Sequence, residues 1–143
     1  MGVATACEVV DPGPEVGVAG RCVTDSAYFV ERVVPDYLEK YDCRNASDGG
    51  CHDIGNGASI FRLRDTSSVL PPSPLDPESS WPEPWQRNLE ATAAQITDCD
   101  NAALSPLYSE PAGGDTRTHA GGDLFPPGGP ELDLLQGWLD AAP

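Results

Sequence analysis

Basic residues are scarce in this chain of 143 residues, in which 8 Lys and Arg stand against 23 Asp and Glu and give a formal net charge of -15. No cluster of Lys and Arg is present to neutralise phosphates, so the sequence argues against nucleic acid as a partner. It argues equally against binding to an anionic membrane surface. No apolar run approaches the roughly 20 residues that cross a bilayer as a helix.

Aromatic side chains are also few, at 7% of the chain, and the hydrophobic fraction is 39%. Glycine and proline contribute 15 residues each, which is above their average combined share of roughly 12%. This composition is lean for a globular domain but is not that of a disordered chain. We therefore expect one domain with a small core and long loops.

The five cysteines are an odd number, so a full set of disulfides leaves one over. The first seven residues lead through small side chains into Cys7, as at the end of a bacterial lipoprotein signal peptide, although its charged and apolar regions are missing. In this interpretation Cys7 carries the lipid anchor, residues 1–20 form a tether, and residues 21–143 form the domain of an exported protein. The alternative is a frayed N-terminus that happens to contain a cysteine.

Apolar periodicity predicts an all-α fold of three to four short helices joined by long Gly/Pro-rich loops. The expected helical segments are 26–41, 85–97, 101–108 and 131–142. Asp25 or Ser26 can cap the first segment, and Pro35 should kink it or split it. Pro106 should break the third, and six prolines in 64–84 predict a surface loop without a helix. The last helix is expected to face the core with Leu132, Leu135, Trp138 and Leu139.

With only two histidines and one methionine, the positions of these residues are informative. His52 directly follows Cys51, and Cys43 lies eight positions before Cys51. Covalent haem attachment uses two thiols and a histidine next to the second thiol, which reaches the iron from one face. The usual spacing is C-x-x-C-H, whereas this chain has C-x7-C-H, with a loop that its glycines allow to bulge.

Further motifs in the same order resemble the planctomycete-type cytochrome c domains of bacterial lipoproteins. The matching stretches, over residues 22–143, are Tyr28-Phe29, Val33 to Leu38, Cys43, Cys51-His52, Phe61 to Leu63, Ser105 to Leu107, Glu110 to Gly114, His119 to Gly122, Phe125 and Leu135 to Ala142.

The resemblance implies a cytochrome c-like domain over 21–143 that binds haem c and transfers electrons. His52 would be the proximal iron ligand, and Cys43 and Cys51 the attachment thiols. His119 would be the second axial ligand, since Met1 lies in the tether. The protein would be periplasmic or anchored in the outer membrane, and a carrier rather than an enzyme. The net charge of -15 suggests a redox partner with a basic surface.

Other interpretations of the same residues remain open. Cys43 and Cys51 can form a disulfide, which would make the chain a haem-free, disulfide-stabilised exported interaction domain. Cys22 and Cys99 are expected to pair in either case, joining the two halves of the chain. A zinc site is possible on ligand type from Cys43, Cys51, His52 and Cys99. His119 can also be an ordinary loop histidine, and a haem enzyme such as a peroxidase would need an open sixth position on the iron.

Overall fold

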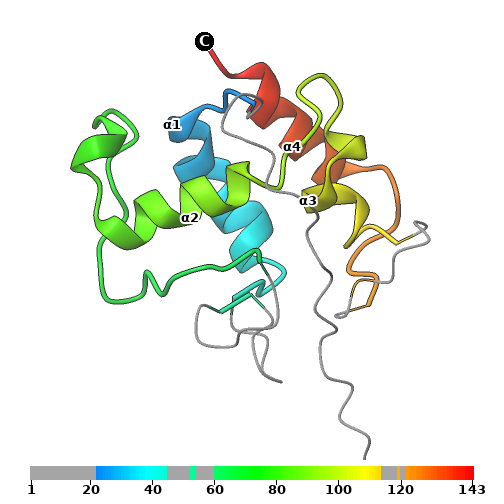
Figure 1. Cartoon of the computed structure of the whole chain (residues 1–143), viewed down its shortest axis with the longest axis horizontal. Coiled ribbons are helices and arrows are strands. Elements are labelled where there is room, and N and C mark those ends of the chain that lie inside the picture. The colour runs from blue at the N-terminus through cyan, green and yellow to red at the C-terminus, as the bar shows by residue number, and fades with distance from the viewer. Residues whose placement is uncertain (1–21, 45–51, 54–59, 114–118, 120–121) are drawn as a thin grey trace, which may run out of the picture.

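The computed structural model describes residues 22–44, 52–53, 60–113, 119 and 122–143 (Figure 1). The fold of these residues is all-α, as the sequence predicts: they contain helices, no strand, and a single isolated bridge between Asp53 and Leu63. The expected tether 1–20 with Cys7, and also Cys51, lie outside the described residues. None of the described helices is long and apolar enough to cross a membrane.

The first helical run consists of α1 (Ser26–Tyr28) and η1 (Phe29–Glu39), which follow each other without a break. Asp25 caps the run as expected, since its carboxylate accepts the Tyr28 backbone N–H at 2.6 Å. Pro35 was expected to kink or split this run, and the split is wrong, because η1 is a π-helix that continues through the proline. In an α-helix the proline ring clashes with the carbonyl group four residues earlier. In a π-helix the backbone hydrogen bonds span five residues, so that carbonyl has a different position relative to the proline ring.

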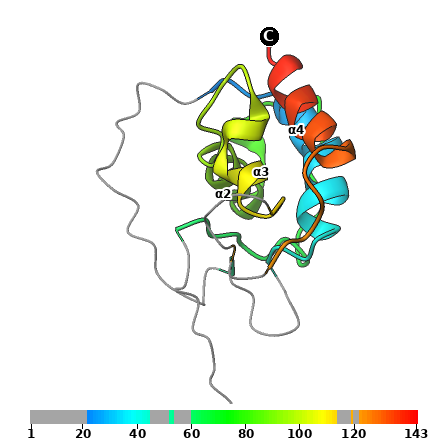
Figure 2. The ribbon, with the colours of Figure 1, turned by 90° about the vertical axis from the view of Figure 1, so that its right-hand side faces the viewer.

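The C-terminal helix α4 (Pro130–Asp140) runs antiparallel to α1 and η1, beside which it lies in Figure 2. At one end the Trp138 indole donates to the Asp25 carbonyl at 2.8 Å. At the other end the Lys40 ammonium donates to Glu131 at 2.8 Å. Between these ends, Phe29 and Trp138 lie with ring centroids 5.6 Å apart at the centre of the core.

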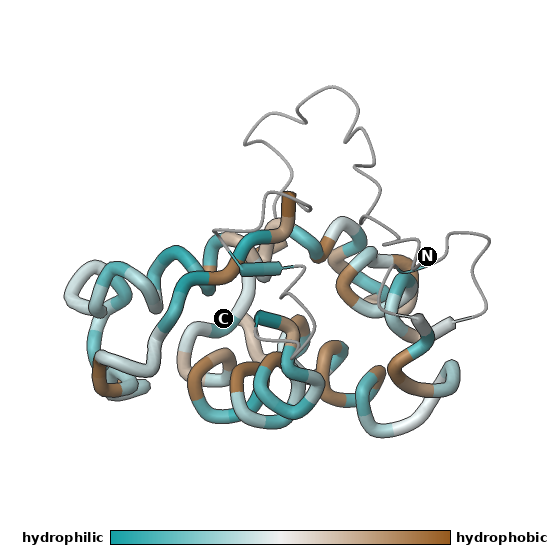
Figure 3. The backbone as a smooth tube through the Cα atoms, turned by 90° about the horizontal axis from the view of Figure 1, so that it is seen from below, coloured by the Kyte–Doolittle hydropathy of each residue, from teal (hydrophilic) through white to brown (hydrophobic). Residues whose placement is uncertain are grey.

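The buried face of α4 differs in part from the expected one. Leu135, Trp138 and Leu139 are buried as predicted, whereas Leu132 is only partly buried and Leu134 is buried in its place. Glu131 is buried as well, at 7% exposure. Apolar and polar residues alternate along the helices in Figure 3, which is the pattern of elements that bury one face.

Helix α2 (Glu83–Ala93) starts two residues before the expected segment and ends four residues earlier. It begins after Pro82, and Pro84 lies in its first turn, where a missing N–H costs no hydrogen bond. A single 3-10 turn, η2 (Glu78–Ser80), precedes it, so the loop predicted without a helix over 64–84 contains one short turn and the start of α2. Trp85 and Leu89 bring α2 into the common core.

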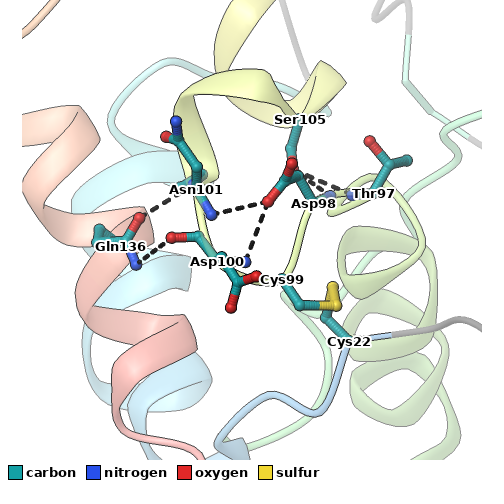
Figure 4. The surroundings of a disulfide bond; sticks show 9 residues. Cys22, Thr97, Asp98, Cys99, Asp100, Asn101, Ser105 and Gln136 are labelled. Atoms are coloured by element: carbon teal, nitrogen blue, oxygen red, sulfur yellow. Dashed lines mark hydrogen bonds between the residues drawn. A yellow bond between two sulfur atoms is a disulfide. The ribbon is translucent and has the colours of Figure 1, made fainter.

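Two short elements, η3 (Ala102–Leu104) and α3 (Pro106–Ser109), are separated before Pro106, as the sequence predicts. The loop that leads to η3 contains Cys99, which forms the expected disulfide with Cys22, with Cα atoms 5.1 Å apart (Figure 4). The Gln136 side chain of α4 holds the same loop, since its oxygen accepts the Ala102 backbone N–H at 3.0 Å.

Candidate functional site

The two histidines of the chain, far apart in sequence, lie next to each other in the structure. The ring centroids of His52 and His119 are 6.0 Å apart, and the ring planes are inclined by 26°. Both side chains are partly buried. The expected haem site consists of Cys43, Cys51, His52 and His119. Among the described residues of this set, the structure brings the two histidines together.

Contacts with the neighbouring segment 60–64 fix the position of His52. Its Nδ1 lies 2.9 Å from the Phe61 carbonyl oxygen, and its ring lies 4.7 Å from the Phe61 ring, centroid to centroid. The His52 carbonyl in turn accepts the Leu63 backbone N–H, next to the Asp53–Leu63 bridge. A carbonyl oxygen can only accept, so Nδ1 carries the proton and Nε2 keeps its lone pair.

Helix α2 holds this segment in place through Asn88, which is 7% exposed. The Asn88 side chain accepts the Arg64 backbone N–H at 2.7 Å and donates to the Arg64 carbonyl at 3.0 Å. Both the oxygen and the nitrogen of the buried Asn88 amide are therefore hydrogen-bonded to the backbone of one residue, Arg64. The position of His52 depends on α2 through this pair of hydrogen bonds.

His119 is fixed by a tight turn in the segment that leads to α4. Its Nδ1 lies 3.1 Å from the Gly122 carbonyl oxygen, and its own carbonyl accepts the Gly122 N–H at 2.8 Å. Gly122 has φ of 77°, a left-handed conformation that favours glycine. Beyond it, Leu124 donates to the Pro111 carbonyl at 2.8 Å, and Phe125 is buried.

The Phe125 ring belongs to an aromatic cluster that connects this segment to η1 and α3. Its centroid lies 5.2 Å from that of Tyr41, 5.7 Å from Tyr108 and 5.9 Å from Tyr37. The Tyr108 hydroxyl also accepts the Gly128 backbone N–H. The second histidine is therefore attached to the rigid core within a few residues on its C-terminal side.

The environment of His52 favours the neutral imidazole. Burial lowers the pKa of His52, the hydrogen bond to the Phe61 carbonyl raises it, and the neighbouring His119 lowers it further. A neutral imidazole is the form that binds a metal ion. Both rings direct Nδ1 to a backbone carbonyl, which is the arrangement that fixes the orientation of metal-ligating histidines.

The spacing of the rings fits a metal ion between them. Two imidazoles bound through Nε2 on opposite sides of one ion, with metal–nitrogen bonds of about 2.0 Å, place their centroids about 6.3 Å apart. The observed separation is 6.0 Å. In the described part of the chain, no group of three or more His, Cys, Asp or Glu side chains is placed to hold a metal ion.

Cys43 has a free thiol that packs against the core at the end of η1. Burial, and next the charge of Asp42, raise the pKa of this thiol to about 12. The structure describes no hydrogen bond between Cys43 and either histidine. Cys51 lies outside the described residues, and the disulfide with Cys22 takes Cys99 out of the four-residue zinc site considered from sequence.

One polar cluster was not expected from the sequence. The Glu131 carboxylate on α4 accepts hydrogen bonds from the Tyr41 hydroxyl and the Lys40 ammonium at the end of η1. These bonds, first that of Lys40 and then that of Tyr41, lower the pKa of Glu131. The partners of Glu131 lie 90 and 91 residues away in the sequence, so no local pattern indicates the cluster. The only signal in the sequence is the acidic first turn of α4.

Comparisons with known proteins add no relative. No family model matches the chain, and neither a search of curated proteins nor a search of solved structures finds a match. The resemblance to cytochrome c domains therefore stays a prediction from sequence motifs.

Proposed function

We propose that this chain is a haem c-binding electron-transfer protein with a cytochrome c-like domain, in which His52 and His119 are the axial iron ligands. The observation that carries the proposal is the close approach of the only two histidines, with centroids 6.0 Å apart and both Nδ1 atoms turned to backbone carbonyls. This donor set and spacing fit an iron ion bound from both faces.

Haem, when bound, supplies one-electron redox chemistry, and ligation by two histidines gives it a lower potential than ligation by His and Met. The residues of the chain orient the two imidazoles. The Phe61 and Gly122 carbonyls fix the two rings, and Asn88 holds the segment that carries Phe61. If both histidines held the iron, no open position would be left for a substrate, which would favour a carrier over an enzyme.

Cys43 and Cys51 are the proposed attachment thiols. A thiol with a pKa near 12 is almost entirely protonated at neutral pH and is a poor nucleophile. Attachment at Cys43 would therefore precede folding of the segment around it. The free thiol of Cys43 also supports the proposal over the haem-free alternative, which needs a disulfide between Cys43 and Cys51.

The remaining features of the proposal come from the sequence. The protein would be exported, lipid-anchored through Cys7, and located in the periplasm or at the outer membrane. A net charge of -15 favours a redox partner with a basic docking surface and an association that weakens as salt concentration rises.

The test is to export the full chain in a bacterium with haem c maturation machinery and to record the pyridine haemochrome spectrum after denaturing extraction. We expect a retained c-type α-band in the wild type. Cys43→Ala and Cys51→Ala should each reduce covalent retention. His119→Ala should keep the covalent haem but change the native spectrum from low-spin to high-spin.

The cysteine and histidine variants control for each other, because they separate attachment from axial ligation. A colourless wild-type protein that lacks free thiols at Cys43 and Cys51 would contradict the proposal. The chain would then be the haem-free, disulfide-stabilised interaction domain.

A further inference from the structure

The two-histidine site has a geometry that does not depend on a porphyrin. Both rings direct Nδ1 to a backbone carbonyl, that of Phe61 for His52 and that of Gly122 in its own turn for His119, which assigns the proton of the neutral imidazole to Nδ1 and leaves Nε2 as the donor to a metal ion. Neither ring makes another hydrogen bond to the described residues. Two imidazole rings with centroids 6.0 Å apart can supply two nitrogen ligands to a transition-metal ion.

The centroid separation can be compared with the values expected for two coordination geometries. Two imidazoles at a tetrahedral angle on one ion, with metal–nitrogen bonds of about 2.0 Å, would have centroids about 5.2 Å apart. The observed 6.0 Å is closer to the value of about 6.3 Å for ligands on opposite sides of the ion. The observed spacing therefore admits one ion between the rings, and the choice among ions rests on ligand chemistry, in which square-planar or tetragonal nitrogen sites suit Cu2+.

We propose that the haem-free chain binds one Cu2+ ion between Nε2 of His52 and Nε2 of His119, with water completing the coordination. Imidazole suits copper, and Cu2+ stands highest in the affinity order of the divalent ions. The strongly negative chain attracts cations. The inference goes beyond the proposed function, since the ion needs only the two side chains, and it predicts that copper and haem exclude each other.

The site is well suited to a clean test because the chain has no third histidine. The full chain is exported in a strain without haem c maturation factors and titrated with CuCl2, with calorimetry and electron paramagnetic resonance as the readouts. We expect one tight Cu2+ per chain, with hyperfine structure from two imidazole nitrogens. His52→Ala and His119→Ala should each weaken binding about tenfold or more.

Two controls keep the test sharp. His119→Gln changes one partly buried side chain outside the helices, so its circular dichroism should match the wild type while its copper affinity falls. ZnCl2 in place of CuCl2 should bind more weakly. Equal copper binding by the wild type and both alanine variants would overturn the inference. So would a signal from only one imidazole, zinc binding as tight as copper, or a haem-free chain that takes no copper.

The outcome is separable from that of the haem experiment. Copper binding through both histidines together with a colourless matured protein would keep this inference and remove the proposed function. A c-type spectrum together with no copper binding by the haem-free chain would keep the proposed haem function and remove the copper site.

Discussion

At the scale of single residues, Glu131 shows how one buried carboxylate joins two helices. It lies at the start of α4 and accepts hydrogen bonds from Tyr41 and Lys40 at the end of η1. The side chain of Glu131 is 7% exposed, whereas that of Lys40 is 50% exposed, so solvent screens the pair from one side. The hydrogen bonds to the charged form lower the pKa of Glu131.

This shift predicts a pH dependence of stability. Because the pKa of Glu131 is lower in the folded state than its ordinary value of about 4.3, the unfolded chain binds the proton more readily. The stabilisation is therefore complete above about pH 4.3 and is lost as the pH falls through the lower folded value. We expect Glu131→Gln to cost roughly 1 kcal/mol at pH 7 and almost nothing at pH 3, measured by urea unfolding.

Asp133 offers a matched control on the same helix. It is also in the first turn of α4, but it is exposed and no ion pair is described for it. Asp133→Asn should change stability little and by a similar amount at both pH values. A loss in Glu131→Gln that is as large at pH 3 as at pH 7 would show that packing, and not the charge, stabilises this end of the molecule.

The residue scale is also where the sequence predicted least. The position of His52 directly after Cys51 indicated one ligand, and the presence of only one other histidine indicated His119. The structure brings the two imidazoles together. Nothing in the sequence indicates that the Phe61 and Gly122 carbonyls orient them, because any residue has a carbonyl and only the fold places it. The same holds for the partners of Glu131.

At the scale of elements, the end of η1 is defined by a capping motif that also positions Cys43. The Asp42 N–H donates to the Glu39 carbonyl at 3.1 Å and the Cys43 N–H to the Leu38 carbonyl at 2.9 Å. These are the two bonds of a Schellman motif, in which the residue at position 42 adopts the left-handed conformation. Asp42 does so with φ of 49°, where glycine is the preferred residue.

We therefore expect Asp42→Gly to stabilise the protein by about 1 kcal/mol. Glycine adopts the left-handed conformation without a steric cost, and the substitution removes a negative charge from the negative end of the helix dipole. The measurement is the midpoint of thermal unfolding for a series at this position.

Asp42→Asn and Asp42→Ala separate the two contributions. Asparagine removes the charge and tolerates the left-handed conformation, so it should give a smaller gain than glycine. Alanine removes the charge but keeps the steric cost, so it should give the least. A ranking with alanine above glycine would mean that charge alone determines stability at this helix end.

Element prediction from sequence succeeded where apolar spacing was regular and failed where the backbone left the α-helical register. Phe29, Val33 and Tyr37 are buried at the expected four-residue steps, and so are Trp85 and Leu89. Pro35 was expected to kink or split the first helix on the assumption of α-helical hydrogen bonds. The π-helical register of η1 has no signature in the apolar spacing, which is that of an α-helix.

At the scale of the whole molecule, the Cys22–Cys99 disulfide joins the start of the first helical run to the loop between α2 and η3 across 77 residues. Hydrogen bonds hold this loop in shape independently of the sulfurs, as Figure 4 shows. Asp98 accepts the Asp100 and Asn101 N–H groups, and the buried Ser105 hydroxyl accepts those of Thr97 and Asp98. The loop that carries Cys99 is therefore ordered by local contacts in addition to the cross-link.

The large loop closed by this bond makes the disulfide important for a domain with a lean core. A cross-link over 77 residues restricts the unfolded chain by an amount worth about 4.5 kcal/mol in the chain-entropy model. We expect the Cys22→Ser, Cys99→Ser double variant to unfold at a much lower urea concentration than the wild type. Because the local hydrogen bonds remain, it should keep its helical circular dichroism in the absence of urea.

Peptide mapping tests the pairing directly, since trypsin cleavage after arginine places the two cysteines in peptides 22–32 and 88–117. These should appear as one cross-linked pair under non-reducing conditions and separate on reduction. Reductant should then shift the unfolding midpoint of the wild type to that of the double variant, while the double variant itself does not respond. If reductant lowered the midpoint of the double variant by the same amount, the stabilising bond would have to involve other cysteines, and the structure around Cys22 would be wrong.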